Sequence, residues 1–199
     1  MPRNCAETTV PGARPQEGLT GAYVIDPVHS AVGFSVRHAM VTNVRGRFTA
    51  FEGFLRLDAL RPARSEAHVS VQTGSLDTGV RERDSHVSGP DFLDSATFPL
   101  MVFRSTAVVP LGGDAFRMTG NLRIKDVELP LHLDLDHGGT VRHADGRRRT
   151  GFEGSATFRR SDWGLNWNVP LKGGGVLLSD KVRLELSVSA LQLGPEALS

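Results

Sequence analysis

Alternation of apolar and polar residues at every second position is the feature that most constrains the fold of this chain. It is typical of half-buried β-strands, because successive side chains of a strand point to opposite faces. One further segment, residues 44–58, changes phase along its length, and Gly46 and Gly53 are candidates there for β-bulges that bend a long strand. The alternating segments are residues 32–37, 67–72, 101–109, 116–124, 127–136, 152–158 and 182–190.

Glycine-rich turns separate these segments, and most connections are far shorter than a parallel crossover requires. The chain is therefore predicted to be all-β, with about eight to ten antiparallel strands. Residues 78–88 are predicted to form the one short helix, with further helical turns near 90–95 and 161–166. A single apolar face on nearly every strand fits either a sandwich or a closed barrel. The lumen of such a barrel is either filled by side chains or holds one small ligand.

The length of 199 residues favours a single folded domain. We expect a flexible extension over residues 1–20, a barrel domain over residues 21–192 and a tail over residues 193–199. The chain has 23 basic and 22 acidic residues, so nucleic acid is not expected as a partner. It has no apolar run long enough for a signal peptide or a membrane span, which predicts a cytoplasmic protein without integral membrane insertion.

The usual motifs of catalysis and metal binding are absent from the sequence. The seven histidines include no closely spaced pair, and Cys5 is the only cysteine, so no metal site is predicted. Asp84, Ser85 and His86 are adjacent, and adjacent helical residues do not face each other as a catalytic triad must. Lys172 precedes the glycines at 173–175, the reverse of a phosphate-binding loop. We therefore predict no catalytic residue and no cofactor.

The inward faces are rich in Phe, Leu and Val, so a ligand in the lumen would be mostly hydrocarbon. Trp163 and Trp167 would share one face if residues 161–166 were helical, either as ordinary packing or as the wall of an apolar pocket. The residues predicted to contact the ligand are Phe34, Val36, Phe48, Phe51, Val69, Val71, Phe103, Met118, Leu133, Phe158, Trp163, Trp167 and Leu184.

Polar side chains near a barrel mouth would orient the head group of such a ligand. The candidates are His38, Arg45, Arg83 and Asp84. For Arg83 and Asp84 the alternative is structural, as a buried ion pair or cap that pins the helix over the barrel.

Four groups of segments resemble, in order and spacing, the YceI-like family of lipid-binding proteins. They are Ile25–His38 with Val44–Gly53, Ser75–Ser105, Met118–Leu135 and Gly151–Ala190. The resemblance implies a lipocalin-like barrel with an apolar tunnel that binds a polyisoprenoid, an isoprenoid quinone or a fatty-acid derivative. It also allows a homodimer. Val87, Leu93 and Trp163 depart from residues common in the family and alter the shape of the pocket, which leaves the identity of the lipid open.

The predicted function is therefore that of a carrier which sequesters a long-chain apolar lipid in the barrel and performs no chemistry. Two alternatives remain open at this point. One is an isomerase or cyclase that acts on a hydrophobic substrate, which would require an acid or base inside the lumen. The other is a stress or interaction protein whose barrel is simply a filled core.

Overall fold

A computed structural model describes residues 19–142, 146–172 and 174–194. Most of the predicted extension and tail, Cys5, Asp145 and Gly173 lie outside the described residues. The strands are β1 (Gly21–Ile25), β2 (Ala31–His38), β3 (Thr42–Phe48), β4 (Phe51–Leu57), β5 (Glu66–Gln72), β6 (Leu76–Asp77), β7 (Leu100–Gly112), β8 (Ala115–Ile124), β9 (Val127–Arg142), β10 (Arg148–Arg159) and β11 (Leu178–Gln192). The α-helix is α1 (Arg81–Ser88), and the 3₁₀ helices are η1 (Pro27–His29), η2 (Pro62–Arg64), η3 (Thr73–Ser75) and η4 (Arg160–Trp163).

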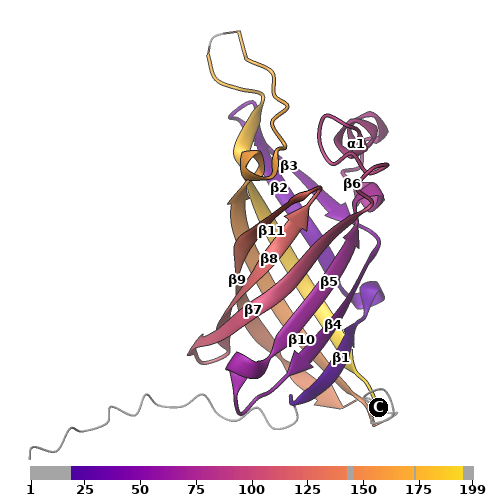
Figure 1. The fold of residues 1–199 in the computed structure, drawn as a ribbon, viewed down its shortest axis with the longest axis vertical. Coiled ribbons are helices and arrows are strands. Elements are labelled where there is room, and N and C mark those ends of the chain that lie inside the picture. The colour runs from indigo at the N-terminus through magenta and orange to yellow at the C-terminus, as the bar shows by residue number, and fades with distance from the viewer. Residues whose placement is uncertain (1–18, 143–145, 173, 195–199) are drawn as a thin grey trace, which may run out of the picture.

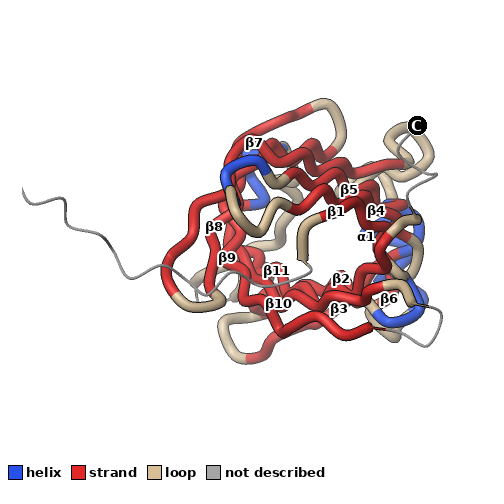
Figure 2. The backbone as a smooth tube through the Cα atoms, turned by 90° about the horizontal axis from the view of Figure 1, so that it is seen from below, coloured by secondary structure: helices blue, strands red, loops and turns tan. Residues whose placement is uncertain are grey.

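The strands form a closed antiparallel barrel, as Figure 2 shows along its length. β1 pairs with both β4 and β11, which completes a ring in the order β1-β4-β5-β7-β8-β9-β10-β11. At the other end of the barrel, β2 takes the place of β1 beside β11, and β3 pairs with β2 and β6. The predicted all-β antiparallel barrel with one short helix is thus confirmed, and the sandwich is excluded.

β1 and β2 form one long barrel strand that is interrupted at η1. The backbone N–H of Asp26 donates to the carbonyl oxygen of Ser189 (2.8 Å), and the Ser30 hydroxyl accepts from the Ser189 N–H (2.9 Å). The Asp26 carboxylate in turn accepts from Nη1 of Arg149 at 2.6 Å. These contacts keep the interrupted strand attached to β10 and β11, where the regular ladder of hydrogen bonds stops.

β3 and β4 form a second long strand, and its interruption lies at residues 49–50. The prediction that Gly46 and Gly53 host the bulges is therefore wrong. Both glycines instead make room for a side chain of the neighbouring strand. A Cβ atom at residue 46 would lie 2.4 Å from Cζ of Phe34, and one at residue 53 would lie 2.5 Å from Cδ1 of Ile25. Such distances are far below van der Waals contact, so a larger residue would displace these apolar groups.

α1 stands beside one end of the barrel, which we call the α1 end (Figure 1). The helix begins at Arg81, three residues later than predicted, because the Asp84 carboxylate accepts from the Thr78 N–H (2.9 Å) and holds Thr78 outside the helix. The helical turn predicted over residues 161–166 is only partly correct, since η4 ends at Trp163 and is capped by Gly164 with a left-handed φ of 73°. Trp163 and Trp167 therefore do not share a helical face. No helix in the described part of the chain is long and apolar enough to cross a bilayer.

Candidate ligand-binding cavities

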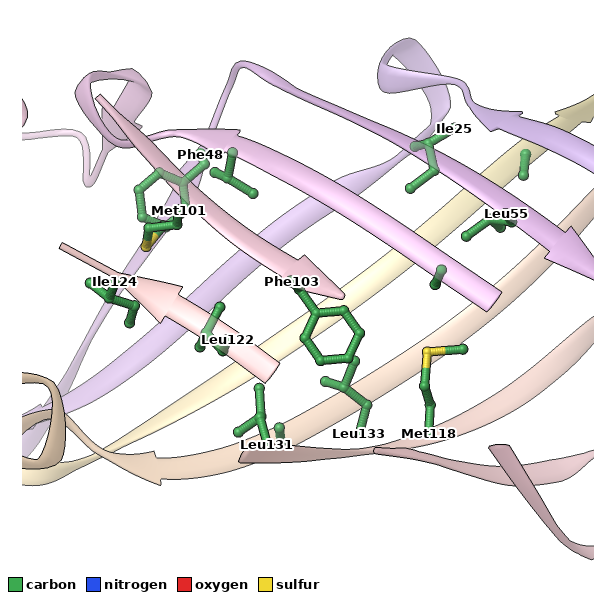
Figure 3. Close-up of a cluster of buried hydrophobic side chains, with 14 of the residues drawn as sticks. Ile25, Phe48, Leu55, Met101, Phe103, Met118, Leu122, Ile124, Leu131 and Leu133 are labelled. Carbon is green, nitrogen blue, oxygen red and sulfur yellow. The ribbon is translucent and has the colours of Figure 1, made fainter. Parts of the chain in front are cut away.

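Two adjoining cavities lie inside the barrel. The first has a volume of about 510 Å³ and extends toward the end opposite α1, and the second has a volume of about 330 Å³ and extends toward the α1 end. Both are lined by Val69, Phe103, Leu133 and Leu186, from four different strands. In Figure 3 the Phe103 ring lies between Met118, which lines the first cavity, and Leu122, which lines the second. Phe103 therefore marks the boundary between the two spaces.

Most of the residues predicted to contact a ligand line these cavities, although contact itself stays a prediction. Met118 lines the first cavity alone. Val69, Phe103 and Leu133 line both. The remaining lining residues of the predicted set belong to the second cavity and are Phe34, Val36, Phe48, Val71, Phe158, Trp167 and Leu184. Alternation was a sufficient signal for the strand residues among them, because a regular strand keeps every second side chain on the inner face. Trp167 lies in the loop after η4.

Two residues of the predicted set line neither cavity. Phe51 lies on the same face of β4 as Leu55, opposite Val71 of β5, but it packs half-buried against the core without lining either cavity. Trp163 is 3% exposed and donates its indole N–H to the carbonyl oxygen of Leu122 (3.0 Å). Its ring meets that of Phe158 edge to face at 4.9 Å. Trp163 thus packs behind the cavity wall and supports it.

Of the polar residues predicted to orient a head group, His38 and Arg83 line the second cavity. Arg45 is exposed and lines neither cavity, and Asp84 also lines neither. Arg83 and Asp84 both hold Thr78, since Nε of Arg83 donates to the Thr78 hydroxyl (2.7 Å) and the Asp84 carboxylate accepts from it. This arrangement fits the structural alternative, although the two side chains meet at Thr78 and not in an ion pair with each other.

The α1 end of the second cavity carries several nitrogen groups and no carboxylate. His38, Arg83, His86 and Arg160 belong to its lining, which contains no Asp or Glu among the described residues. The His86 ring meets the Trp167 ring edge to face at 4.6 Å, and its Nε2 atom lies 3.0 Å from the Asp91 carboxylate. An apolar cavity that ends in nitrogen donors suits a ligand with a hydrocarbon tail and an acceptor group at one end.

Arg160 is a lining residue that the sequence analysis missed. Arg160 is only 6% exposed, and burial lowers the pKa of its guanidinium from its usual value. Nε donates to the carbonyl oxygen of Ser179 (3.1 Å), and Nη1 donates to the carbonyl oxygens of Trp167 (3.0 Å) and Leu165. Nη2 has no hydrogen-bond acceptor among the described residues. No sequence signal distinguishes Arg160 from its exposed neighbour Arg159.

The first cavity opens near η2, where Asp58 is the single carboxylate among its described lining residues. Asp58 accepts from the backbone N–H groups of Leu60 (3.1 Å) and Arg61 (2.9 Å) and from Nε of Arg61 (3.2 Å). The Asp58 carboxylate is engaged by these bonds, which hold the loop between β4 and β5 in place. The described residues contain no group of three or more His, Cys, Asp or Glu side chains that could hold a metal ion.

Comparison with known proteins agrees with this architecture. The YceI-like domain family matches residues 23–190 of the chain. The chain belongs to the YceI-like family. The UPF0312 protein of Azotobacter vinelandii is 34% identical to this YceI-like chain over 151 residues, which are 75% of this chain and 79% of that protein. A UPF0312 protein of Shewanella oneidensis is 36% identical over 145 residues, 72% of this chain and 76% of that protein.

Solved structures show the same fold. BcnA of Burkholderia cenocepacia has a TM-score of 0.72 and 22% identity, with 83% of this chain and 98% of that one covered. A Campylobacter jejuni YceI protein, crystallised with monobromobimane as guest, has a TM-score of 0.70 and 26% identity, with 79% and 90% covered. A polyisoprenoid binding domain from Saccharophagus degradans has a TM-score of 0.63 and 15% identity, with 86% and 98% covered. These likenesses support the barrel architecture of the YceI-like chain.

Proposed function

We propose that this chain binds one long-chain apolar lipid, with the tail in the two adjoining cavities, and carries or stores it without chemical change. The observation that supports this most is the continuous apolar wall from Ile25 and Met118 in the first cavity to Phe48 and Leu184 in the second. Burial of one methylene group contributes about 0.8 kcal/mol, so a tail of about twenty carbons would gain roughly 16 kcal/mol before its ordering costs are subtracted. Burial of the tail would then dominate the affinity.

The α1 end of the second cavity would hold the head group. Arg160 Nη2, Arg83 and His38 offer hydrogen-bond donors there, and no carboxylate belongs to the described lining, whereas His86 is engaged by the Asp91 carboxylate just outside it. A phosphate, a carboxylate or a quinone carbonyl would accept from them. The proposed ligand classes are polyisoprenoids, isoprenoid quinones and fatty-acid derivatives. The polyisoprenoid binding domain of Saccharophagus degradans shares the fold, which makes a polyisoprenoid the first ligand to test.

The two alternatives receive less support. A filled core would leave no space inside the barrel, whereas about 510 Å³ and 330 Å³ are open in the two cavities. An enzyme would need an acid or base near the tail, but the ionisable lining residues lie at the cavity ends. His38 and His86 are the candidate bases of that alternative. The cytoplasmic location and the homodimer stay predictions of the sequence.

The deciding experiment is organic extraction of the purified protein followed by mass spectrometry of the extract. We expect a lipid in stoichiometric amount, and we expect stripped protein to take up an added polyprenyl phosphate. Recovery of the added lipid with unchanged mass and unchanged chromatographic retention would support a carrier, and a product that differs in mass or in retention would support the enzyme. Protein that carries no lipid and takes none up would contradict the proposal.

A further inference from the structure

Two loops stand together above the α1 end of the barrel (Figure 1). One is the turn between β2 and β3, residues 39–41, and the other comprises residues 164–172 and 174–177 between η4 and β11. The N–H of Ala39 donates to the carbonyl oxygen of Leu177 at 2.7 Å, which joins the two loops. We call them the mouth loops. Their exposed apolar side chains are Met40 (61%), Val41 (80%), Val169 (40%) and Val176 (41%).

The turn between β2 and β3 has a strained backbone at Ala39 and at the exposed Met40. Ala39 and Met40 both have positive φ values, 49° and 62°. Two consecutive residues in this region are the requirement of a type I′ turn, which strongly favours Asn followed by Gly. Alanine and methionine carry a steric cost there that Gly avoids. The turn therefore holds an apolar side chain in water at a position where its backbone geometry favours glycine.

The charges within the mouth loops and on the adjoining strands β2 and β3 are positive. Residues 27–51 and 163–179 contain no Asp or Glu, and they contribute Arg37, Arg45 and Lys172 as exposed cations. Neither Arg37 nor Arg45 forms an ion pair with any other described residue, whereas Arg47, farther from the turn, pairs with Asp77 at 3.1 Å. Exposed apolar side chains flanked by unpaired cations match a bilayer surface that contains anionic lipids.

The mouth loops are also continuous with the second cavity, since His38, Leu177 and Leu178 line it. We propose that the mouth loops dock on an anionic lipid bilayer, with Met40 and Val41 entering the interface and Arg37 and Arg45 meeting the head groups. Docking in this orientation would place the α1 end of the cavity against the membrane. This orientation would set where the proposed lipid ligand enters and leaves the cavity. Docking itself can be measured whether or not the barrel contains lipid.

The test is sedimentation of the full chain with vesicles of phosphatidylcholine, with and without phosphatidylglycerol. We expect partitioning onto the phosphatidylglycerol vesicles that weakens as salt is added, because each cation near an anionic surface contributes about fivefold to binding. Met40→Asp with Val41→Asp should lower the partition coefficient at least about tenfold. Val141→Asp is the matched control, because Val141 is also 61% exposed but lies in β9 at the opposite end of the barrel. It should bind like the parent chain.

A second variant separates docking from folding. Ala39→Asn with Met40→Gly suits the positive φ values, so it should raise the thermal midpoint while it weakens vesicle binding. Absence of binding to phosphatidylglycerol vesicles, or an equal loss in Val141→Asp, would overturn the proposal. So would self-association that depends on Met40 and Val41 without vesicle binding, because a second copy would then cover the mouth loops. Vesicle binding by a chain that takes up no lipid would leave docking supported and the proposed carrier function wrong.

Discussion

The ring of Phe103 lies over Gly120 of the neighbouring strand, where a Cβ atom at residue 120 would be 2.4 Å from Cζ of Phe103. The glycine is therefore the reason that a ring fits at this place inside the barrel. Phe103 is 8% exposed and lines both cavities. Its position makes it the side chain best placed to limit how far a lipid tail reaches from one cavity into the other.

Phe103→Leu should widen the passage between the two cavities and shift the bound lipids toward longer tails. The measurement is mass spectrometry of the lipids extracted from the parent and variant proteins. We expect a loss in free energy of unfolding of roughly 1–2 kcal/mol, because the smaller side chain buries less apolar surface and enlarges the open space. Phe51→Leu is the control, because Phe51 is another strand phenylalanine that packs against the core but lines neither cavity. An identical lipid profile in all three proteins would show that Phe103 sets no limit on tail length.

The two tryptophans differ in their relation to the second cavity, and this makes ligand binding visible by fluorescence. Trp167 lines the cavity, whereas Trp163 lies behind its wall with its indole N–H bonded to Leu122. Addition of a polyprenyl phosphate to stripped protein should therefore change the emission of Trp167. The change should persist in Trp163→Phe and vanish in Trp167→Phe. The opposite pattern would place the ligand elsewhere.

The fold was predictable from the sequence because alternation of side chains is a local and regular property of strands. The same rule assigned Phe34, Val36 and Leu184 to the inner face, where the structure has them. Alternation does not tell which inner side chains border open space. Phe51 lies on the inner face opposite Val71 but packs into the core, and Trp163 lies in η4, outside any strand.

The buried position of Arg160 could not be predicted from the sequence, for a different reason. A charged residue is expected at the surface unless its partners are known. Its partners are backbone carbonyl groups of Leu165, Trp167 and Ser179, which only the folded chain brings together. Every residue type has a backbone carbonyl group, so the sequence does not show which residues will accept a hydrogen bond from Arg160. Buried cations that are held by carbonyl groups therefore have to be found in the structure.

Arg160→Met should destabilise the chain, because three buried or partly buried carbonyl groups would lose their donor. We expect a decrease of about 3 kcal/mol in the free energy of unfolding, together with faster loss of bound lipid from the second cavity. Arg160→Lys should restore little, since one ammonium group does not reproduce the planar array of guanidinium donors. Arg159→Met is the matched control, because Arg159 is 66% exposed and its nearest carboxylate, that of Asp180, is 3.8 Å away. Equal stability losses at residues 159 and 160 would contradict this interpretation.

Asp26 is the carboxylate with the most strongly lowered pKa, and it lies where β1 gives way to β2. The bond from Arg149 at 2.6 Å contributes most, with His29 and the Val28 N–H adding to it, and together they lower the pKa from 3.8 to about 2. The Asp26 side chain is 12% exposed and that of Arg149 is 22% exposed, so water screens this pair less than a surface pair. The carboxylate thus connects the interruption of the first barrel strand to β10.

Because the folded-state pKa of Asp26 lies below its unfolded value, its stabilising effect is present above about pH 4 and is lost as the pH falls toward about 2. Asp26→Asn should lower the free energy of unfolding by about 2 kcal/mol at neutral pH, since it also leaves Arg149 without its partner. The difference from the parent chain, measured by urea denaturation across this range, should shrink toward the acid end. Asp134→Asn, which removes an exposed partner of Arg117, should show no comparable trend. A difference at Asp26 that stays constant with pH would mean that the side chain acts through packing and not through its charge.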